Sequence, residues 1–237
     1  MRQVKNSKRH ENLVTLLNPN STISEVYRML RTNLDFMSLD DPINSMVITS
    51  TIPGEGKTVT GANLAIVNAQ AGRKTIIVDA DLRKPMMHRV FQTSNMKGVT
   101  TTLLKKNTSE EAIYHTKIEN LDIITSGPIP PNPAEVVGSN AMKELIEQLK
   151  QTYDLVIVDS PPVMSVVDAR LLGKSVDGLL FVVSSNQVSR TALKKAKESM
   201  DLVGVRVIGA VLNKKKVNKK DGYYYYYQYG YGNNLEK

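Results

Sequence analysis

The chain of 237 residues contains no cysteine and no tryptophan. The absence of cysteine excludes a disulfide framework, a thiolate metal site and a thiol nucleophile, and it suits the reducing cytoplasm. No apolar run approaches the roughly 18 residues that a membrane-spanning helix needs. The N-terminal sequence also lacks the hydrophobic core of a signal peptide. We therefore expect a cytoplasmic protein without a membrane segment of its own.

Phenylalanine is scarce as well, with three residues against ten tyrosines, and seven of those tyrosines fall in the last fifteen residues. The core must therefore be built from Val, Ile, Leu, Met and Ala, and the C-terminal end has a separate role. No internal repeat and no Gly/Ser-rich linker is visible, which favours one folded domain. The formal net charge of +8 favours acidic partners such as nucleotides, nucleic acid or anionic lipid, without choosing among them.

Short apolar segments alternate with longer segments of helical spacing. Residues 1–22 are polar and predict a mobile arm, and a helix is expected from Ser24 onwards. Strands are expected at 46–49, 74–78, 121–125, 155–158, 179–183 and 207–212, and further helices at 58–71, 134–150 and 189–203. Continuous apolar strands between helices predict an α/β fold with a mostly parallel, twisted sheet and helices on both faces. The domain is expected to span 23–213, followed by a flexible Lys- and Tyr-rich tail, 214–237.

A glycine-rich segment follows the first expected strand and precedes a helix, which is the context that a P-loop requires. Gly54 and Gly56 allow the backbone to close around a phosphate group. Lys57 is expected to reach the β- and γ-phosphates, and the Thr58 hydroxyl to bind Mg²⁺. Thr51 replaces the first glycine of the usual motif. A glycine-rich turn with an exposed lysine is the alternative, but the strand and helix on either side favour a P-loop NTPase-like fold.

Three aspartates stand at the ends of expected strands. Asp79 and Asp81 are two residues apart, so they share one face of an extended chain, and Asp159 ends another apolar strand. In open α/β sheets, ligands bind at the carboxyl ends of the strands. Each aspartate alone could simply mark a strand end. Together with the P-loop, the three predict a metal–phosphate centre.

These segments resemble known motifs. The loop at 51–58, the sequence IIVDADLR at 76–83 and the sequence VIVDSPP at 156–162 resemble the Walker A, A′ and B motifs of bacterial tyrosine kinases (BY-kinases). The likeness is to the cytoplasmic kinases of capsule and exopolysaccharide synthesis of Gram-positive type. The sequence SGPIPPNP at 126–133 is also similar to a stretch of that family. The resemblance covers about 24–213, together with the tyrosine-rich end.

The resemblance implies an ATP- and Mg²⁺-dependent protein-tyrosine kinase. It assigns Lys57 and Thr58 to ATP·Mg²⁺, Asp81 and Asp159 to the metal with Thr58, and Asp79 to the proton of the acceptor tyrosine. Asp79 and Asp81 could exchange these roles through water. The nucleotide-binding residues that it implies are Pro53, Gly54, Glu55, Gly56, Lys57, Thr58, Val59 and Asn213.

Other interpretations stay open at this point. A partitioning-type switch ATPase of the deviant Walker class is the main alternative, but that class carries a signature lysine where this chain has Ile52. Arg83 either neutralises phosphate charge or is an ordinary surface arginine. Glu25, Arg28 and Arg31 match the Glu-x-x-Arg-x-x-Arg pattern of the kinase family, which implies an interface in a ring-shaped homo-oligomer. Without the resemblance, they would be a solvated helix face.

The C-terminal tyrosines follow a lysine-rich stretch, and few aliphatic residues accompany them, so we expect an accessible, disordered tail. The expected autophosphorylation sites are Tyr223, Tyr224, Tyr225, Tyr226, Tyr227, Tyr229 and Tyr231. The family implies phosphorylation in trans that weakens the ring, a membrane adaptor of polysaccharide export that recruits the kinase to the membrane, other tyrosine substrates and a cognate phosphatase. Such a tail could also bind single-stranded nucleic acid, or be a sticky segment without a specific function. No nucleic-acid-binding fold is visible, and we expect no nucleic-acid partner.

Overall fold

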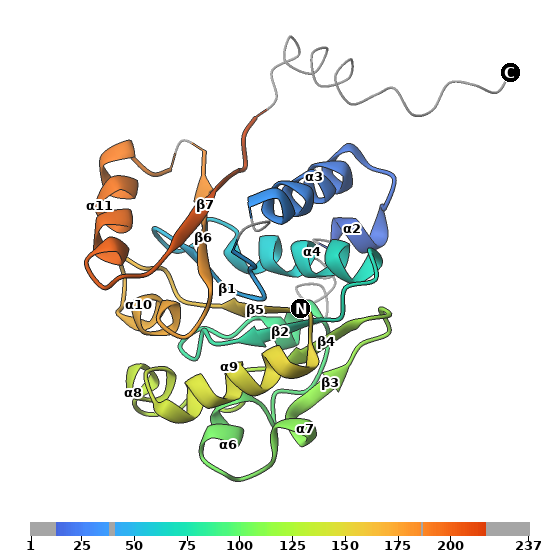
Figure 1. Ribbon diagram of the computed structural model, residues 1–237, viewed down its shortest axis with the longest axis vertical. Helices are drawn as coiled ribbons and strands as arrows, with labels where there is room; N and C mark the ends of the chain where they lie inside the picture. Colours follow the sequence, from blue (N-terminus) through green and yellow to red (C-terminus); the bar gives the residue numbers. More distant parts are fainter. Residues whose placement is uncertain (1–12, 38–40, 186, 217–237) are drawn as a thin grey trace, which may run out of the picture.

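The structure is a computed structural model, which describes residues 13–37, 41–185 and 187–216. Its centre is a seven-stranded sheet in the order β3-β4-β2-β5-β1-β6-β7 (Figure 1). Every neighbouring pair is parallel except β3 and β4. The strands are β1 (Ser45–Ser50), β2 (Thr75–Asp79), β3 (Ile113–His115), β4 (Leu121–Ile124), β5 (Leu155–Asp159), β6 (Gly178–Ser184) and β7 (Val207–Asn213). The predicted α/β class and mostly parallel sheet are confirmed.

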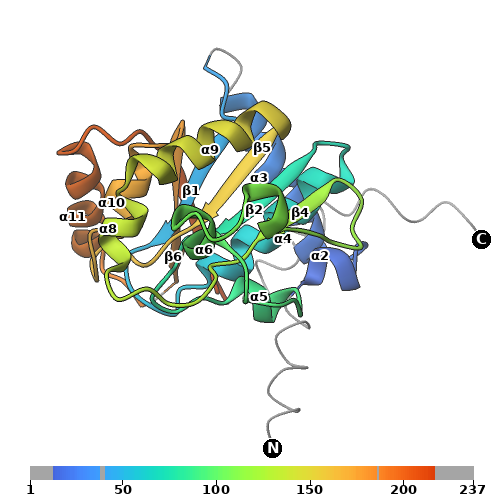
Figure 2. The ribbon, with the colours of Figure 1, turned by 90° about the horizontal axis from the view of Figure 1, so that it is seen from below.

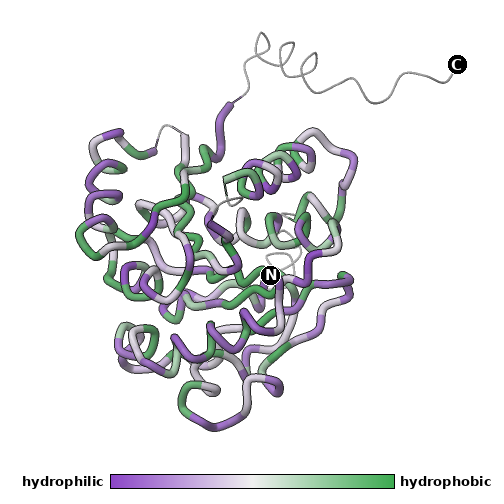
Figure 3. Tube along the Cα trace, viewed as in Figure 1, coloured by the Kyte–Doolittle hydropathy of each residue, from purple (hydrophilic) through white to green (hydrophobic). Residues whose placement is uncertain are grey.

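Helices cover both faces of the sheet, and each face has its own apolar core (Figures 1 and 2). One face is covered by α2 (Val14–Leu17), α3 (Thr22–Met37), α4 (Lys57–Gln70) and α5 (Met87–Val90). The other is covered by α6 (Val99–Leu103), α7 (Ser109–Ala112), α8 (Pro133–Val137), α9 (Asn140–Thr152), α10 (Asp168–Gly173) and α11 (Arg190–Asp201). Figure 3 shows the hydrophilic stretches mainly on the outer helices. No helix among the described ranges is both long and apolar enough to span a bilayer.

The apolar strand sequences explain the layered arrangement. Every residue of β1, β2, β5 and β6 is buried, because helices pack on both sides of these strands. β7 instead has exposed and half-buried residues along its length, as expected of a strand at the edge of the sheet. The parallel order brings the carboxyl ends of β1, β2, β5 and β6 to one edge, where the P-loop begins.

Two predicted elements differ from the structure. The single helix expected at 134–150 is divided into α8 and α9, because Ser139 accepts a hydrogen bond from the Met142 amide (3.2 Å) and starts a new helix. The short antiparallel strand β3 was not predicted, since its three residues give no clear alternation.

The prediction of a mobile N-terminal arm at 1–22 is wrong for the last part of that range. Leu13 is fully buried in the core beneath α4, and the Thr15 hydroxyl donates to Asn63 Oδ1 at 2.8 Å. Residues 13–22 are therefore packed on the domain rather than free. Residues 1–12 lie outside the described residues, as do 217–237, so the expected tyrosine tail stays a prediction there.

Candidate active site

The P-loop runs from the end of β1 to the first turn of α4. Gly54 and Gly56 have φ values of 86° and 96°, in the left-handed region that favours glycine. A Cβ atom on Gly56 would lie 2.2 Å from Asn213 Nδ2, so no larger residue fits there without a shift. Lys57 and Thr58 open α4 directly after this turn. The loop has the curvature of a phosphate cradle at a helix N-terminus.

Glu55 lies within this loop, but its side chain points into the protein and is fully buried. Glu55 Oε2 accepts a hydrogen bond from the Ile52 amide at 2.9 Å, and Oε1 accepts one from the Ser184 amide at 2.8 Å. Ser184 is the last residue of β6. The carboxylate therefore ties the loop to itself and to the sheet, which leaves only the backbone of Glu55 for a nucleotide. No pattern in the sequence indicated this structural role of the Glu55 side chain.

The predicted lysine, threonine and two of the aspartates meet at one point. Lys57 Nζ lies 2.9 Å from Asp81 Oδ2 and 3.3 Å from each carboxylate oxygen of Asp159. The Thr58 hydroxyl donates to Asp159 Oδ2 at 2.7 Å. These contacts follow from the sheet order, because β2 and β5 are neighbours and β5 also adjoins β1. The sequence motifs thus form a single compact charge cluster.

Asp79 lies behind this cluster, paired in register with Asp159. Its side chain is fully buried, and Oδ2 accepts the amide hydrogens of Met86 (3.0 Å) and Met87 (2.9 Å). Oδ1 is buried without a hydrogen-bond partner among the described residues. Burial, reinforced by the nearby charge of Asp159, raises the pKa of Asp79 to about 7. Asp79 therefore changes protonation state near neutral pH.

The neighbouring charged groups respond to the same environment. Burial raises the pKa of Asp159, while Lys57 and the Thr58 hydroxyl act in the opposite direction. Burial alone would lower the pKa of Lys57, but the charges of Asp159 and Asp81 outweigh it and raise the pKa of the ammonium. The lysine stays charged and holds together two carboxylates that would otherwise repel each other.

The donor set suits a hard divalent cation. Thr58 and the carboxylates of Asp81 and Asp159 supply the oxygen ligands that Mg²⁺ prefers, and they already surround the Lys57 ammonium. Within the described ranges, no three acidic or histidine side chains converge closely enough to hold a metal alone. A cation here would therefore depend on phosphate oxygens as well, as Mg²⁺ does in nucleotide sites.

The end of β7 closes the other side of the loop. Asn213 Nδ2 donates to the Glu55 carbonyl at 2.8 Å, and Lys214 Nζ donates to the Gly54 carbonyl. Asn213 is thus beside the P-loop, as expected, while its contact with adenine stays a prediction. Pro53 and Val59 lie at the start of the loop turn and in the first turn of α4.

Arg83 is not an isolated surface arginine. Its Nε and Nη2 atoms donate to Asp168 Oδ2 and Oδ1 at 2.9 and 3.1 Å, and the Asp168 side chain is fully buried. This bidentate pair fastens the loop after β2 to the start of α10. The sequence did not indicate Asp168, which has no recognisable motif around it.

The three residues expected at an oligomer interface do not share one free face. Arg28 pairs with Glu25 and donates to the Pro19 carbonyl (2.6 Å) on the exposed side of α3. Arg31 instead donates to the Val67 carbonyl of α4 at 2.9 Å. Glu25, Arg28 and Arg31 all stay candidates for an interface, and Arg31 in addition joins two helices of one chain.

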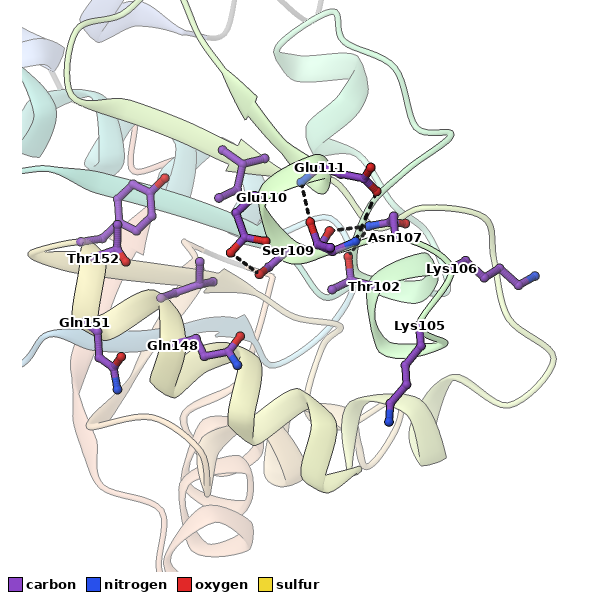
Figure 4. A pocket seen from close by; sticks show the side chains of 14 residues that line it. Thr102, Lys105, Lys106, Asn107, Ser109, Glu110, Glu111, Gln148, Gln151 and Thr152 are labelled. Carbon is purple, nitrogen blue, oxygen red and sulfur yellow. Dashed lines mark hydrogen bonds between the residues drawn. The ribbon is translucent and has the colours of Figure 1, made fainter.

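A pocket of about 770 Å³ lies elsewhere, between the α6–α7 region and the C-terminal end of α9 (Figure 4). Lys105 and Lys106 line it from the turn after α6, and Gln148 and Gln151 line it from α9 (Figure 4). It contains none of the predicted site residues, so it is separate from the P-loop centre.

The family of the chain follows from its relatives in sequence. A model of the AAA domain family matches residues 43–207. The tyrosine-protein kinase YwqD of Bacillus subtilis is 44% identical over 226 residues, which cover 94% of this chain and 95% of that protein. The chain belongs to the bacterial tyrosine kinase family. The predicted family is therefore confirmed.

Solved structures agree with this assignment. The chimerical protein CapA2B2 superposes with a TM-score of 0.83 at 43% identity, covering 86% of this chain and 90% of that one. The kinase domain of the Escherichia coli tyrosine kinase ETK gives a TM-score of 0.82 at 33% identity, covering 87% and 82%. The septum site-determining protein MinD of Pyrococcus horikoshii, complexed with Mg-ADP, gives 0.64 at 25% identity, covering 75% and 73%. The ETK kinase domain thus matches this chain better than MinD does.

Proposed function

We propose that this BY-kinase transfers the γ-phosphoryl group of ATP to tyrosine hydroxyl groups of proteins. The observation that carries the proposal is the cluster of Lys57, Thr58, Asp81 and Asp159 at the P-loop, in a chain related over most of its length to tyrosine-protein kinases. The tyrosine oxygen would form a bond to the γ-phosphorus as the bond from that phosphorus to the bridging β-γ oxygen breaks, which leaves ADP. Positioning and charge neutralisation dominate catalysis of such reactions.

The residues divide into distinct tasks in this proposal. The loop amides at 53–59 and Lys57 hold the phosphates, and Asn213 contacts the base. Thr58, Asp81 and Asp159 would hold Mg²⁺. The metal, when bound, supplies positive charge to the phosphate oxygens. Lys57 must leave its carboxylate partners to reach a phosphate group, so binding of ATP·Mg²⁺ exchanges one cation for another among the same oxygens.

Asp79 is the proposed acceptor of the tyrosine proton. Its Oδ1 atom has no hydrogen-bond partner among the described residues, and its pKa of about 7 makes it a usable base near neutral pH. Asp81 is less suitable, because one oxygen contacts the Lys57 ammonium and the other accepts the Lys84 amide at 3.0 Å. Asp79 is fully buried, so the proton would reach it through a water molecule or after the 82–87 loop moves.

The seven tyrosines at 223–231 are the proposed acceptors within the chain itself, presented in trans to a second copy. We further propose a ring-shaped oligomer in which Glu25, Arg28 and Arg31 contribute to the contacts and which tail phosphorylation dissociates. The likeness to the chimerical CapA2B2 protein supports a partner protein that would act as a membrane adaptor, recruiting this cytoplasmic kinase to polysaccharide export. We also propose tyrosines of other proteins as substrates and a cognate tyrosine phosphatase as a partner. We propose no nucleic-acid partner.

A switch ATPase is the second candidate, favoured only by the fold shared with MinD. Ile52 stands at the position of that class's signature lysine, and the ATPase interpretation leaves the tyrosine cluster without a role.

Intact mass after incubation with ATP and Mg²⁺ tests the proposal on the wild type, Lys57→Met and a chain shortened after Asp221. We expect added phosphates on the wild type and on neither variant. Hydrolysis of ATP without a gain in mass would instead favour the switch ATPase. If the wild type is silent in both assays, the same measurement is repeated with a cytoplasmic adaptor segment fused to its N-terminus, and continued silence would overturn the kinase proposal.

A further inference from the structure

In the segment that follows the catalytic Asp81, all charged side chains are positive. Between Asp81 and Glu110 the chain has no acidic residue at all. Over the same 28 positions, 82–109, it has six basic ones, namely Arg83, Lys84, Arg89, Lys97, Lys105 and Lys106. A chain with 31 basic and 23 acidic residues would ordinarily mix the two signs over such a length. The segment therefore has a formal net charge of +6.

The first part of this segment crosses the edge of the sheet that carries the active site. The Lys84 amide donates to Asp81 Oδ1 at 3.0 Å. Further along, Asn95 Nδ2 donates to the Gly127 carbonyl at 2.8 Å, just beyond the carboxyl end of β4. The chain at 83–97 thus runs along the same edge of the sheet as the catalytic carboxylates.

Only part of this positive charge is compensated. Arg83 is paired with Asp168, and Lys97 Nζ lies 3.6 Å from Glu111. Lys84 and Arg89 are exposed, and neither has a carboxylate partner within ion-pair distance among the described residues. The recorded side-chain contact of Arg89 is a hydrogen bond from Nε to His88 Nε2 at 3.3 Å. Two free cations therefore stand on either side of the turn that leads into α5, beside the proposed base.

We propose that Lys84 and Arg89 form a docking site for a phosphotyrosine that neighbours the acceptor tyrosine, in the tyrosine cluster of a second copy of this chain. This inference rests on the proposed kinase function. Five tyrosines are consecutive at 223–227, and residues two apart in an extended chain are separated by about 7 Å. A phosphate already on the cluster therefore lies within reach of the surface while a neighbouring tyrosine enters the active site.

Charge explains why the phosphorylated form is the preferred occupant. The stretch 214–222 that precedes the cluster has five lysines and a single aspartate, so an unmodified tail is repelled by Lys84 and Arg89. Each phosphate adds about −1.5 to −2 charges and three strong acceptor oxygens. The first transfer thus converts a poor substrate into a better one, and modification of the cluster accelerates as it proceeds.

Peptide binding tests this without any need for turnover. Two labelled peptides of sequence 222–232, one unmodified and one phosphorylated at Tyr225, are titrated into phosphatase-treated full-length protein without ATP. We expect the phosphopeptide to bind at least about fivefold more tightly at low salt, and the preference to shrink as salt is added. The double variant Lys84→Ala/Arg89→Ala should lose the preference. Lys174→Ala/Lys195→Ala removes two exposed lysines elsewhere on the molecule and should keep it.

Equal binding of the two peptides by the wild type, or an unchanged preference in the Lys84/Arg89 variant, would overturn the proposal. Each single substitution is measured too, with its melting temperature, so that a folding defect is recognised. In turnover with ATP, the double variant should show a higher KM for the phosphopeptide, with kcat and the KM for ATP unchanged. A wild type that binds the phosphopeptide but phosphorylates neither peptide, with the adaptor segment fused as well as without it, would contradict the kinase proposal while leaving the docking site in place.

Discussion

Asp79 and Asp159 are register partners at the ends of the neighbouring parallel strands β2 and β5, and both side chains are almost completely buried. Two carboxylates so placed repel each other when both are ionised, and among the described residues the Lys57 ammonium makes its ion pairs with Asp159 and Asp81 rather than with Asp79. The site therefore stores an unfavourable interaction, as functional sites often do. Its energetic consequences are open to measurement.

Asp79→Asn should stabilise the protein at pH 8. The folded-state pKa of Asp79 is raised from 3.8 to about 7, so the folded state binds its proton more tightly than the unfolded state. Stability then falls as pH rises from about 4 to about 7 and stays low above that. The asparagine oxygen can still accept the Met86 and Met87 amides. We expect a midpoint higher by about 2–8 °C at pH 8, a smaller gain at pH 5, and little phosphotransfer.

The pH profile of the reaction separates Asp79 from Asp81 as the proton acceptor. With Asp79 as base, kcat/KM should rise through an apparent pKa near 7, and Asp79→Asn should abolish the rise. Asp81→Asn should instead raise the Mg²⁺ concentration needed for activity. A profile that keeps its rise in Asp79→Asn would contradict the assignment.

Lys57→Met should destabilise the protein as well as inactivate it. Removal of the ammonium leaves the buried carboxylates of Asp81 and Asp159 without their cation, a change that costs about 3 kcal/mol or more for buried pairs. The loss should be smaller at pH 5, where Asp159 is protonated more readily because its pKa is raised. Urea unfolding at both pH values, with and without Mg²⁺, measures this. Equal stability of wild type and variant would show that the ion pair does not stabilise the fold.

Glu55→Gln should loosen the P-loop. One amide hydrogen of glutamine would meet the backbone N–H of Ile52 or Ser184, so a donor faces a donor, at a cost of about 1–3 kcal/mol. We expect ADP to bind about tenfold more weakly by calorimetry, with a lower melting temperature. Glu144→Gln, on the exposed side of α9, is the control and should change neither. Unchanged ADP affinity would show that the buried carboxylate does not position the loop.

Gly56→Ala should be more harmful than Gly72→Ala, although both glycines have a positive φ, 96° and 86°. A Cβ on Gly72 meets nothing within 4 Å, whereas one on Gly56 meets Asn213 Nδ2 at 2.2 Å. Gly72→Ala should therefore cost about 1 kcal/mol from backbone strain alone. Gly56→Ala should cost more and weaken ADP binding, and Asn213→Ala in the same chain should recover part of the difference. Equal losses for both glycines would contradict the steric argument.

Much of this architecture could be predicted because its signals are local. Buried parallel strands are continuous apolar runs, and the P-loop and strand-end aspartates occur where such a fold places a nucleotide. The division of the 134–150 helix was missed because one serine cap outweighed an otherwise continuous pattern. The packing of Leu13 was missed because a short polar stretch gives no periodicity from which to recognise a single buried anchor.

The contacts that complete the site depend on residues far apart in sequence, which no spacing could indicate. Glu55 meets Ser184, and Arg83 meets Asp168, across 129 and 85 positions. Arg31 belongs to a motif expected on the surface, so the sequence did not indicate that its side chain donates a hydrogen bond to the backbone of α4. Side-chain direction, rather than residue type, decided each of these cases.

The hydrogen bonds from Asn213 and Lys214 to the P-loop carbonyls have a mechanical consequence. The nucleotide loop is fastened at the point where the chain leaves the sheet and continues toward the tyrosine cluster. Any displacement of the chain at 213–214 would be transmitted to the loop through these two side chains. The position of the chain at 213–214 and the shape of the phosphate loop are therefore set together.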